Sequence, residues 1–551
     1  MVAFGQILEG FAVRRKRKPA SVCGALTGSA GARALDAEAS AEWGLDPFAL
    51  VEAAGRACAI EFLNFFRKES PNIVVLAGSG NNAADALVML RALILSGYAQ
   101  QSGCLVFLTK MPEDHLPAGG KSPLSQALLS VQKIGVAAAQ WESAKKPLLG
   151  DADVIIDGIS GTGLNTPLRG AALEMAQAVN ALQERQNRPF VVSIDLPSGC
   201  FDGWRPGMPV IAADATLAIE PQKLCLYTPA TRIHAGHIIP VGGIFPPALI
   251  GQHREAELVS WENVCALIPP VAEDAYKYER GVVEIRAGSA PAAGAARLAA
   301  WGAQAAGAGL VRLIVDPSLY PVIAPACSGV MVIPDGETPA DDRFSPAAAL
   351  LGPGWGKGED RRRQLESYLP LEERGLPLIL DADAIHLAKD IVFHGNALLT
   401  PHPGEFASYT GLSKEEILAD PIPVLRRFAA GKNVVILFKS HVLYAASPDG
   451  RIGIIDGMNP ALGAGGTGDV LAGFCASIAA RWRATAARWR ATAARAGRQS
   501  GGFDGYTCAC AAASLLVRAA HSIADRFADP AEVADAAASV AGAAWLPRGK
   551  R

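Results

Sequence analysis

The stretch NPALGAGGTGDVLAG, residues 459–473, is the most informative part of this 551-residue chain. It places four glycines just before Asp469 and an apolar run just after it. Glycine tolerates positive φ and carries no Cβ, so a glycine run that opens a helix predicts backbone N–H groups converging on an anion. We therefore expect a phosphate-binding turn at Gly465, Gly466 and Gly468, with Asp469 beside the anion.

Composition limits the classes of protein to consider. Hydrophobic residues make up 50% of the chain and charged residues 19%, which is typical of a globular protein with a large core. The net charge of -2 provides no general basic field for nucleic acid. No run of about 18 strongly apolar residues predicts a membrane span. The basic run RRKRK at residues 14–18 is interpreted as a solvated tail, with targeting or binding to an anionic surface as the alternative.

The ten cysteines are scattered along the chain. Their spacing matches neither a zinc site nor a disulfide framework, because the close pair in CAC (Cys508 and Cys510) lacks both the two-residue spacer and a partner pair. Reduced thiols in the cytoplasm are the expected state.

Apolar runs of strand length alternate with Ala-rich helical runs along most of the chain. NIVVLAG (72–78), VVSIDLPSG (191–199) and VVILFKS (434–440) are continuous rather than alternating in their hydrophobicity. Such strands predict parallel sheets covered by helices on both faces, so the fold class is α/β. A Pro-rich stretch at 242–260 divides the chain. We expect a disordered extension at 1–25, one domain at 26–250 and a second at 257–551.

One heptapeptide is duplicated in tandem. RWRATAA occupies residues 481–487 and again 488–494. A seven-residue period keeps similar residues near one helical face, so the pattern predicts a surface helix lengthened by about two turns. A basic binding arm is the alternative interpretation.

Three strand-like runs of the C-terminal half end in polar residues. They are LLGPGWGKG (350–358), LILDADAIHL (378–387) and LLTPHPGEF (398–406). Open α/β sheets bind ligands at the carboxyl ends of their strands, so these ends are candidate site residues. Taken singly, Asp381 or Asp383 could equally cap the following helix, and His402 could be a hydrogen-bonded loop histidine.

Taken in order with GTGDVLAG, these motifs resemble the ribokinase-like carbohydrate kinases and, within them, the NAD(P)H-hydrate dehydratases. The similarity runs over about residues 277–520. It implies a ribokinase-like α/β domain that uses ADP, with Mg²⁺, to dehydrate S-NAD(P)HX to NAD(P)H, releasing AMP and phosphate. In that scheme Asp469 is the base that accepts the hydroxyl proton. Ser440 and Ala287 stand where the family has glycine.

The same resemblance implies two sets of ligand contacts. The hydrate would contact Ala295, Gly354, His402 and Asp469. The nucleotide would contact Lys439, Ser440, His441, Val442, Leu443, Gly465, Gly466 and Gly468.

The N-terminal half carries a second ordered series of motifs. ALDAEASAEWGLDPFALVEAAGRA (34–57), VVLAGSGNNAADALVML (74–90), DVIIDGISGTGLNTPLRG (153–170) and VVSIDLPSGCFDG (191–203) follow one another. The series resembles the NAD(P)H-hydrate epimerases, a Rossmann-like, doubly wound family, over about residues 26–247. The resemblance implies interconversion of R- and S-NAD(P)HX, with Asp195 as the catalytic residue.

This resemblance also implies a potassium site and a substrate site. K⁺ would be bound by Asn82, Asp157 and Ser198, whose oxygens suit a hard monovalent cation. The substrate would contact Asn81, Asn82, Ala83, Ala84, Asp85, Gly161, Thr162, Gly163, Leu164, Asn165, Thr166, Pro167 and Asp195.

One departure affects the epimerase half. Ala83, Ala84 and Ala86 replace glycines of the family's loop. At a positive φ each alanine would strain the backbone, and its methyl group would intrude on the ligand. We therefore expect lower epimerase activity than in a protein with the glycines restored.

The combined interpretation is a bifunctional enzyme that repairs hydrated NADH and NADPH. Its expected partners are NAD(P)HX and ADP, without nucleic acid or membrane, in a cytoplasmic homo-oligomer. The alternative is a ribokinase-like small-alcohol kinase whose Rossmann-like half is a non-catalytic binding module.

Overall fold

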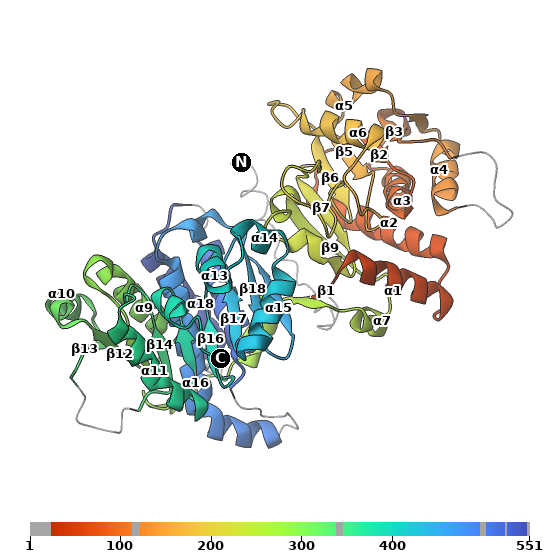
Figure 1. Ribbon diagram of the computed structural model, residues 1–551. Coiled ribbons are helices and arrows are strands. Elements are labelled where there is room, and N and C mark those ends of the chain that lie inside the picture. The colour runs from red at the N-terminus through yellow and green to blue at the C-terminus, as the bar shows by residue number, and fades with distance from the viewer. Residues whose placement is uncertain (1–23, 113–121, 338–344, 496–502, 524–525, 548–551) are drawn as a thin grey trace.

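A computed structural model describes residues 24–112, 122–337, 345–495, 503–523 and 526–547. Figure 1 shows two lobes, one formed by the red-to-yellow part of the chain and one by the green-to-blue part. RRKRK and nearly all of the predicted extension at 1–25 lie outside the described residues. Within the described segments, no helix is long and apolar enough to cross a membrane, and the nine cysteines are free thiols.

The N-terminal lobe is built on a seven-stranded parallel sheet. Its order is β4 (Ala137–Gln140), β3 (Cys104–Leu108), β2 (Ile73–Ala77), β5 (Val154–Gly158), β6 (Phe190–Ile194), β7 (Ala215–Ile219) and β9 (His237–Val241). The chain winds outward from β2 in one direction and from β5 in the other. The order therefore reverses between β2 and β5, where open α/β sheets bind ligands.

Helices cover both faces of this sheet. The helices of this half are α1 (Ser29–Ala41), α2 (Pro47–Phe65), α3 (Asn81–Leu95), α4 (Pro123–Lys133), α5 (Pro147–Gly150), α6 (Gly170–Asn180) and α7 (Pro247–Gln252). One core joins α2, α3 and α4 to residues such as Val75, and the other joins α6 to neighbours such as Val74 and Leu76. Successive strand residues thus enter opposite cores, which explains the continuous apolar runs of the sequence.

The second sheet has twelve strands. Its order is β13 (Val330–Pro334), β12 (Leu310–Val315), β11 (Val282–Arg286), β14 (Ala348–Leu351), β15 (Leu378–Leu380), β16 (Ala397–Leu399), β17 (Val435–Phe438), β18 (Val442–Ala446), β19 (Ile452–Asp456), β10 (Ala256–Leu258), β1 (Ala25–Thr27) and β8 (Gln222–Lys223). The strands from β13 to β17 are parallel, and β18 is antiparallel to both neighbours. The order reverses between β11 and β14, which marks a second ligand-binding edge.

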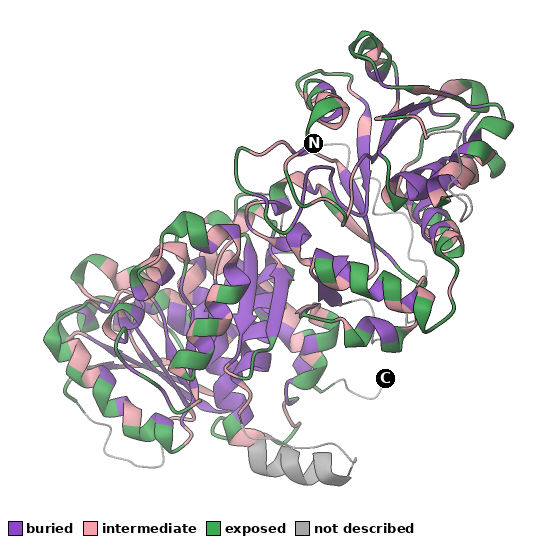
Figure 2. Cartoon of the chain, turned by 45° about the vertical axis from the view of Figure 1, so that its right-hand side comes forward, coloured by how far each residue is buried: buried purple, intermediate pink, exposed green. Residues whose placement is uncertain are grey.

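This sheet is also covered on both faces. Its helices are α8 (Trp261–Val264), α9 (Ala293–Ala305), α10 (Tyr320–Ile323), α11 (Glu359–Glu373), α12 (Asp383–Leu387), α13 (Pro403–Thr410), α14 (Lys414–Ala419), α15 (Pro421–Lys432), α16 (Thr467–Arg495), α17 (Gly505–His521) and α18 (Pro530–Trp545). The helices α9, α16, α17 and α18 pack on one face and α11 to α15 on the other. Figure 2 shows the strands as the buried interior of each lobe. The predicted α/β class is confirmed for both halves.

The two halves of the chain are not separated by the break at 250–260. The short strands β1 and β8, both from the first half, extend the twelve-stranded sheet through β10. One apolar core also contains Phe201, Trp204 and Leu226 together with Phe406 and Leu425. The N-terminal half therefore packs against the C-terminal half through both backbone pairing and apolar contact.

The repeated heptapeptide lies in α16, so the predicted long helix is confirmed. The expectation that the repeat lies on a surface helix is wrong for its first two residues. Arg481 and Trp482 are 1% and 7% exposed. The Arg481 guanidinium donates to the Ala306 carbonyl and lies 4.5 Å from the ring centroid of Trp545. Burial, with Arg280 nearby, lowers the pKa of Arg481 to about 10. The duplication thus begins in the core.

Candidate active sites

A cavity of about 840 Å³ opens at the carboxyl ends of β2 and β5, at the switch in strand order. Its wall includes the turn before α3, the loop after β5 and the inner side of α1. Of the residues predicted to contact substrate, it brings together Asn81, Asn82, Asp85, Gly161, Thr162, Gly163, Leu164, Thr166, Pro167 and Asp195. Asn165 lies in the same loop but is not among the residues that line the cavity.

Asp195 is held in an uncommon backbone conformation at the end of β6. Its φ is +63°, and the Leu196 N–H donates to the Ile194 carbonyl at 2.7 Å across it. A turn of this kind with positive φ is rare and strained for a non-glycine residue. The next turn requires Gly199, at φ +100°, because a Cβ there would meet the Pro209 carbonyl. This turn places Asp195 in the wall of the cavity.

Lys223 faces Asp195 and was not predicted from the sequence. Its Nζ donates to Asp195 Oδ1 at 2.7 Å and to the Ile219 carbonyl at 3.0 Å. The side chains of Lys223 and Asp195 are 5% and 9% exposed, so this ion pair is buried. Lys223 belongs to β8, a two-residue strand with no periodicity for a sequence to display. In the sequence, only the EPQK turn and its position along the chain could have indicated Lys223.

Two further carboxylates share this cavity. Burial, reinforced by Asp195 and Asp36, raises the pKa of Asp85 well above its usual range. Asp85 Oδ1 has no hydrogen-bond partner among the described residues. Burial, with Asp195 nearby, also raises the pKa of Asp36 on α1, although Lys223 opposes the effect. Three carboxylates around one ammonium favour a neutral, proton-carrying Asp85 beside the ion pair of Asp195 and Lys223.

The three predicted potassium ligands lie in one hydrogen-bonded group. Asp157 is fully buried and accepts from the Ser198 N–H at 2.8 Å and from the Ser198 hydroxyl. The Ser160 carbonyl accepts from the Asn82 amide at 3.0 Å, and the Ser198 hydroxyl oxygen lies 3.3 Å from the same carbonyl oxygen. A buried carboxylate, a hydroxyl, an amide and a carbonyl converging in this way form a donor set that fits a monovalent cation.

The expected effect of Ala83, Ala84 and Ala86 on the substrate loop is wrong in its mechanism. All three residues lie in α3, and none is among the residues with positive φ. Their side chains are 0% exposed and belong to the apolar core beneath the helix rather than to the cavity wall. Ala86 packs on Gly158 of β5, where an added Cβ would lie 2.6 Å from the Ala86 methyl group. Helix α3 begins at Asn81, so these positions need no glycine.

The second candidate site lies at the carboxyl ends of β15, β16 and β17. Asp381 follows β15, is 2% exposed, and accepts from the Lys439 ammonium and from the Thr400 hydroxyl, each at 2.6 Å. Asp381 therefore does not act as the cap of α12, which begins at Asp383 without a side-chain cap. Asp383 instead accepts from the Gly356 N–H at 2.8 Å and fixes the glycine turn after β14.

Asp469 lies in the first turn of α16, beside this ion pair. Burial and the neighbouring Asp381 and Glu405 carboxylates raise its pKa to about 7, although Lys439 opposes the shift. Burial disfavours the ammonium form of Lys439, but Asp381, Glu405 and Asp469 outweigh it and its pKa is raised. A carboxylate with a pKa near neutrality at a helix N-terminus suits a general base.

The glycines before Asp469 have different roles. Gly466 has φ +103°, and a Cβ there would meet Leu298 at 2.5 Å. At Gly463 and Gly465 an added Cβ would meet open space, and at Gly468 it would lie 3.3 Å from Lys439 Nζ. Gly466 therefore makes the turn, while the backbone around Gly465 and Gly468 stays open to an anion beside the lysine.

The remaining predicted hydrate contacts surround this strand edge. Gly354, at φ +55°, packs on the chain at Ala295, whose Cβ would lie 3.1 Å from a Cβ at Gly354. His402 is the N-cap of α13: its Nδ1 accepts from the Gly404 N–H at 2.9 Å, and Glu405 completes a capping box. The His402 side chain is 56% exposed, and its Nε2 lies 3.4 Å from Glu405 Oε1.

The predicted nucleotide loop, residues 439–443, runs from the end of β17 into β18. The Lys439 N–H donates to the Pro401 carbonyl at 2.8 Å, and the Ser440 hydroxyl accepts from the Val442 N–H at 3.2 Å. Leu443 is 3% exposed and points into the core. Lys439 is therefore the residue of this loop whose side chain reaches Asp381 and the start of α16.

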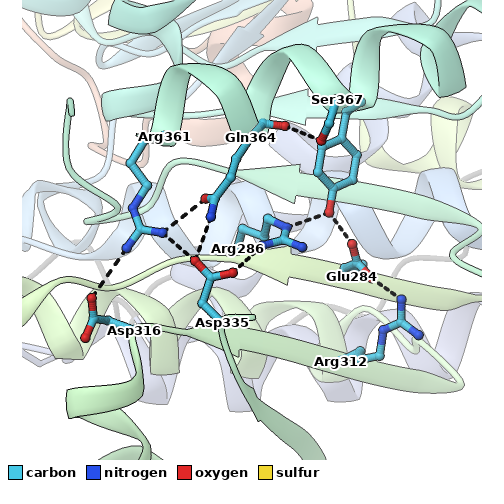
Figure 3. Close-up of polar contacts among 9 residues, drawn as sticks. Glu284, Arg286, Arg312, Asp316, Asp335, Arg361, Gln364 and Ser367 are labelled. Atoms are coloured by element: carbon cyan, nitrogen blue, oxygen red, sulfur yellow. Dashed lines mark hydrogen bonds and ion pairs between the residues drawn. The ribbon is translucent and has the colours of Figure 1, made fainter. Parts of the chain in front are cut away.

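A polar network joins β11 and the end of β13 to helix α11 (Figure 3). Asp335 accepts from Arg286 at 2.9 Å, from Arg361 at 2.7 Å and from Gln364 at 2.7 Å. Arg286 also donates to the Tyr368 hydroxyl at 2.7 Å, and that hydroxyl donates to Glu284. Asp335 also lines a second cavity of about 680 Å³. Since its oxygens are engaged by three side chains, we interpret the network as structural.

Metal-ligand geometry is absent from both carboxylate clusters. Among the described residues, no group of three or more His, Cys, Asp or Glu side chains is arranged to hold a metal ion. In each cluster a lysine ammonium provides the positive charge instead. A divalent cation would therefore enter with phosphate ligands rather than occupy a cage made by the protein alone.

Comparison with known proteins identifies two families along the chain. The profile of NAD(P)H-hydrate dehydratases matches residues 283–538, and that of the YjeF-related protein N-terminus matches residues 47–225. A bifunctional NAD(P)H-hydrate repair enzyme Nnr from Moorella thermoacetica is 30% identical over 477 residues, covering 81% of this chain and 86% of that protein. The enzyme of the same name from Escherichia coli is 28% identical over 84% of this chain and 86% of that protein.

A solved structure is also similar to part of the chain. The ADP/ATP-dependent NAD(P)H-hydrate dehydratase from Bacillus subtilis, co-crystallised with ATP and Mg²⁺, is 26% identical with a TM-score of 0.43. The match covers 51% of this chain and 97% of that structure.

Proposed function

This chain belongs to the family of bifunctional NAD(P)H-hydrate repair enzymes, and we propose that it catalyses both the epimerisation and the dehydration of hydrated nicotinamide cofactors. The C-terminal half is the ADP-dependent dehydratase and the N-terminal half is the epimerase. The presence of both families in one chain disfavours the alternative of a small-alcohol kinase. We propose the division into 1–25, 26–250 and 257–551 for these parts.

In the dehydratase reaction the 6-hydroxyl oxygen of S-NAD(P)HX attacks the terminal phosphoryl group of ADP. The bond from that group to AMP breaks, and the hydroxyl proton passes to Asp469. Phosphate then leaves C6 while a proton leaves C5, which restores the dihydropyridine ring of NAD(P)H. Phosphorylation is needed because hydroxide is a poor leaving group and phosphate is a good one.

The observation that carries this proposal is the position of Asp469. It lies at the N-terminus of α16, beside the ion pair of Asp381 and Lys439, with its pKa raised to about 7 by burial and neighbouring carboxylates. The helix terminus and the Lys439 ammonium favour the negative charge that develops on the transferred group. The same arrangement provides a base for its acceptor.

We propose the following contacts for the two ligands of this half. The hydrate lies against Ala295, Gly354, His402 and Asp469, and the nucleotide against Lys439, Ser440, His441, Val442, Leu443, Gly465, Gly466 and Gly468. Mg²⁺ would enter with the nucleotide phosphates, for which Asp381 and Glu405 supply nearby carboxylates. ADP is the proposed donor.

In the epimerase reaction we propose that Asp195 moves the proton and Lys223 fixes its carboxylate. The strained turn at Asp195 and the neutral form favoured for Asp85 support an acid and a base facing one cavity. The cavity of about 840 Å³ is large enough to hold one of the two nucleotides of a dinucleotide substrate. Asn81, Asn82 and the loop 161–167 would line the substrate, while Ala83 and Ala84 would contribute through their backbone alone.

K⁺ would be held by Asn82, Asp157 and Ser198. Bound there, it would supply positive charge to the loop that faces the substrate phosphates. Cytoplasmic location and a homo-oligomeric state are further proposals; the free cysteines favour a reducing compartment. Light scattering of the purified chain would give the oligomeric state.

The test is to supply the protein with S-NADHX, ADP and Mg²⁺ and to follow the return of NADH absorbance. We expect NADH, AMP and phosphate in equal amounts. A stable phosphorylated product would identify a kinase instead. R-NADHX without ADP, resolved by chromatography, tests the epimerase separately.

A further inference from the structure

The segment 222–232 touches both candidate sites. At its start, Lys223 pairs with Asp195 in the N-terminal cavity. Yet β8, which carries Lys223, is the terminal strand of the twelve-stranded sheet and pairs with β1 through Leu26 and Thr27. One short segment of the N-terminal half is thus part of the sheet that carries the dehydratase residues.

The later part of the same segment contacts the nucleotide loop. His441 Nε2 and the Pro229 carbonyl are 2.8 Å apart, so the imidazole donates from Nε2. Three residues further on, the Tyr444 hydroxyl donates to the Tyr227 carbonyl. Tyr227 and Tyr444 are 2% and 1% exposed, so this second contact is sealed from solvent.

A third contact holds the end of β19, which lies next to the loop. Arg232 binds both carboxylate oxygens of Asp456, at 2.8–3.0 Å, and the Arg232 side chain is 8% exposed. The next residue, Gly457, donates its N–H to the His441 carbonyl at 3.0 Å. The side chain of His441 is therefore held directly by Pro229, and its backbone is held next to a residue that Arg232 fixes.

These contacts matter because they hold His441 from outside the loop. Within the loop the Ser440 hydroxyl bonds to the backbone of Val442, whereas the exposed His441 is held by Pro229 and Gly457. A loop that binds phosphate must hold its backbone in place before the ligand arrives, since ordering it on binding reduces affinity.

We propose that the N-terminal half is a structural part of the nucleotide site, and that His441 is a positioning residue held by the Pro229 carbonyl. This inference rests on the proposed assignment of residues 439–443 to the nucleotide. It predicts that nucleotide affinity in the full chain depends on a contact made by the epimerase half.

The test compares His441→Ala with His441→Gln in the full-length protein. Alanine removes the donor to Pro229, whereas the Gln Nε2 can reach the same carbonyl. We expect KM for ADP to rise roughly fivefold in His441→Ala, the loss of one neutral hydrogen bond. KM for S-NADHX and the rate of R-NADHX epimerisation should change less than about twofold, and His441→Gln should restore most of the ADP affinity.

Arg426→Ala is the matched control. Arg426 donates to the Glu255 carbonyl, in the segment that joins the two halves, at 2.6 Å, but it lies on α15 outside the nucleotide loop. It should leave KM for ADP unchanged. An equal rise in Arg426→Ala, or a His441→Ala protein with wild-type KM for ADP, would overturn the inference and leave only general packing between the halves.

Calorimetric titration with ADP separates this inference from the proposed function. If wild-type protein binds ADP but does not dehydrate NADHX, the proposed function fails while the affinities of the His441 variants still decide the inference. If wild-type protein dehydrates NADHX and His441→Ala binds ADP normally, only the inference fails. If wild-type protein does not bind ADP, both are contradicted.

Discussion

The two candidate sites share one arrangement in different settings. In each, a lysine with little solvent exposure is surrounded by three carboxylates: Lys223 by Asp36, Asp85 and Asp195, and Lys439 by Asp381, Glu405 and Asp469. Each cluster also lies at a strand edge where a helix begins after a glycine turn. The shared arrangement provides excess negative charge around one cation, so at least one carboxyl group holds its proton near neutral pH.

The difference lies in which carboxyl group is protonated and how far it is from solvent. In the N-terminal cavity, Asp85 is 8% exposed, and its pKa is raised well above the usual range. In the C-terminal site, Asp469 is half-buried and its pKa is about 7. The first setting suits a group that keeps a proton, and the second suits a group that exchanges one at physiological pH. The comparison predicts separable effects of mutation.

The largest expected effect is on dehydration. Asp469→Asn keeps the shape of the side chain but cannot accept the hydroxyl proton, so turnover with S-NADHX and ADP should fall on the order of 10²- to 10⁴-fold. Epimerisation of R-NADHX by the same protein should be unchanged. A variant that keeps more than a third of wild-type turnover would show that Asp469 is not the base.

Asp195→Asn should give the converse result. Asparagine tolerates the φ of +63° at this position, so the turn is preserved while the charge is removed. We expect epimerisation to fall on the order of 10²-fold, with dehydration of S-NADHX changed less than twofold. Asp195→Ala is the comparison variant in which the positive φ strains the backbone. Loss of dehydration in Asp195→Asn would contradict the conclusion that the two reactions use separate sites.

The pH dependence of dehydration should follow Asp469. Below a pKa of about 7, its unprotonated fraction falls tenfold with each pH unit, so kcat/KM for S-NADHX should fall in the same way and level off above that pH. Calorimetric titration with ADP at each pH separates the ionisation of the nucleotide from that of Asp469. A profile that is flat between pH 5 and pH 8 would contradict the raised pKa.

Restoring the glycines should lower stability rather than raise activity. Ala83, Ala84 and Ala86 are helical and buried, so replacing all three with glycine removes core methyl groups and adds backbone entropy to the unfolded chain. The expected loss is roughly 2–3 kcal/mol of unfolding free energy, measured by urea denaturation. Faster epimerisation in the triple variant would instead support the view that the methyl groups obstruct substrate.

The smallest effect is expected from the repeat. Deleting residues 481–487 moves the second copy into the place of the first, so an arginine and a tryptophan again occupy the buried positions 481 and 482. The helix would shorten by about 10 Å at its end. We expect dehydratase turnover within twofold of wild type, and a large loss would place the end of α16 at a site or an interface.

The positions of candidate site residues were predicted best where a site is built from local motifs. Asp381, His402, Lys439 and Asp469 each follow a strand or open a helix, and the motif that contains each residue also determines its position. Lys223 and Asp36 were missed because β8 and α1 reach the cavity only through tertiary packing. The three short strands β1, β8 and β10 have two or three residues each, too few to show a period. For that reason the shared sheet was also missed.

Two errors have one physical cause. Ala83 was expected in a loop because a glycine motif suggested one, and Arg481 was expected on a surface helix because it begins a tandem duplication. In both cases the helix determines the environment: α3 begins early enough to bury Ala83, and α16 directs Arg481 toward Trp545. Burial of a charged or small residue depends on which helical face it occupies, and a single motif does not specify that face.

If one chain carries two separable activities, a single time course should reveal both. A mixture of R- and S-NADHX is supplied with ADP and Mg²⁺, and NADH absorbance is followed to completion with wild-type, Asp195→Asn and Asp469→Asn proteins. We expect that wild-type protein converts the whole mixture, that Asp195→Asn stops after the S fraction, and that Asp469→Asn forms almost no NADH. Complete conversion by Asp195→Asn at the wild-type rate would contradict it.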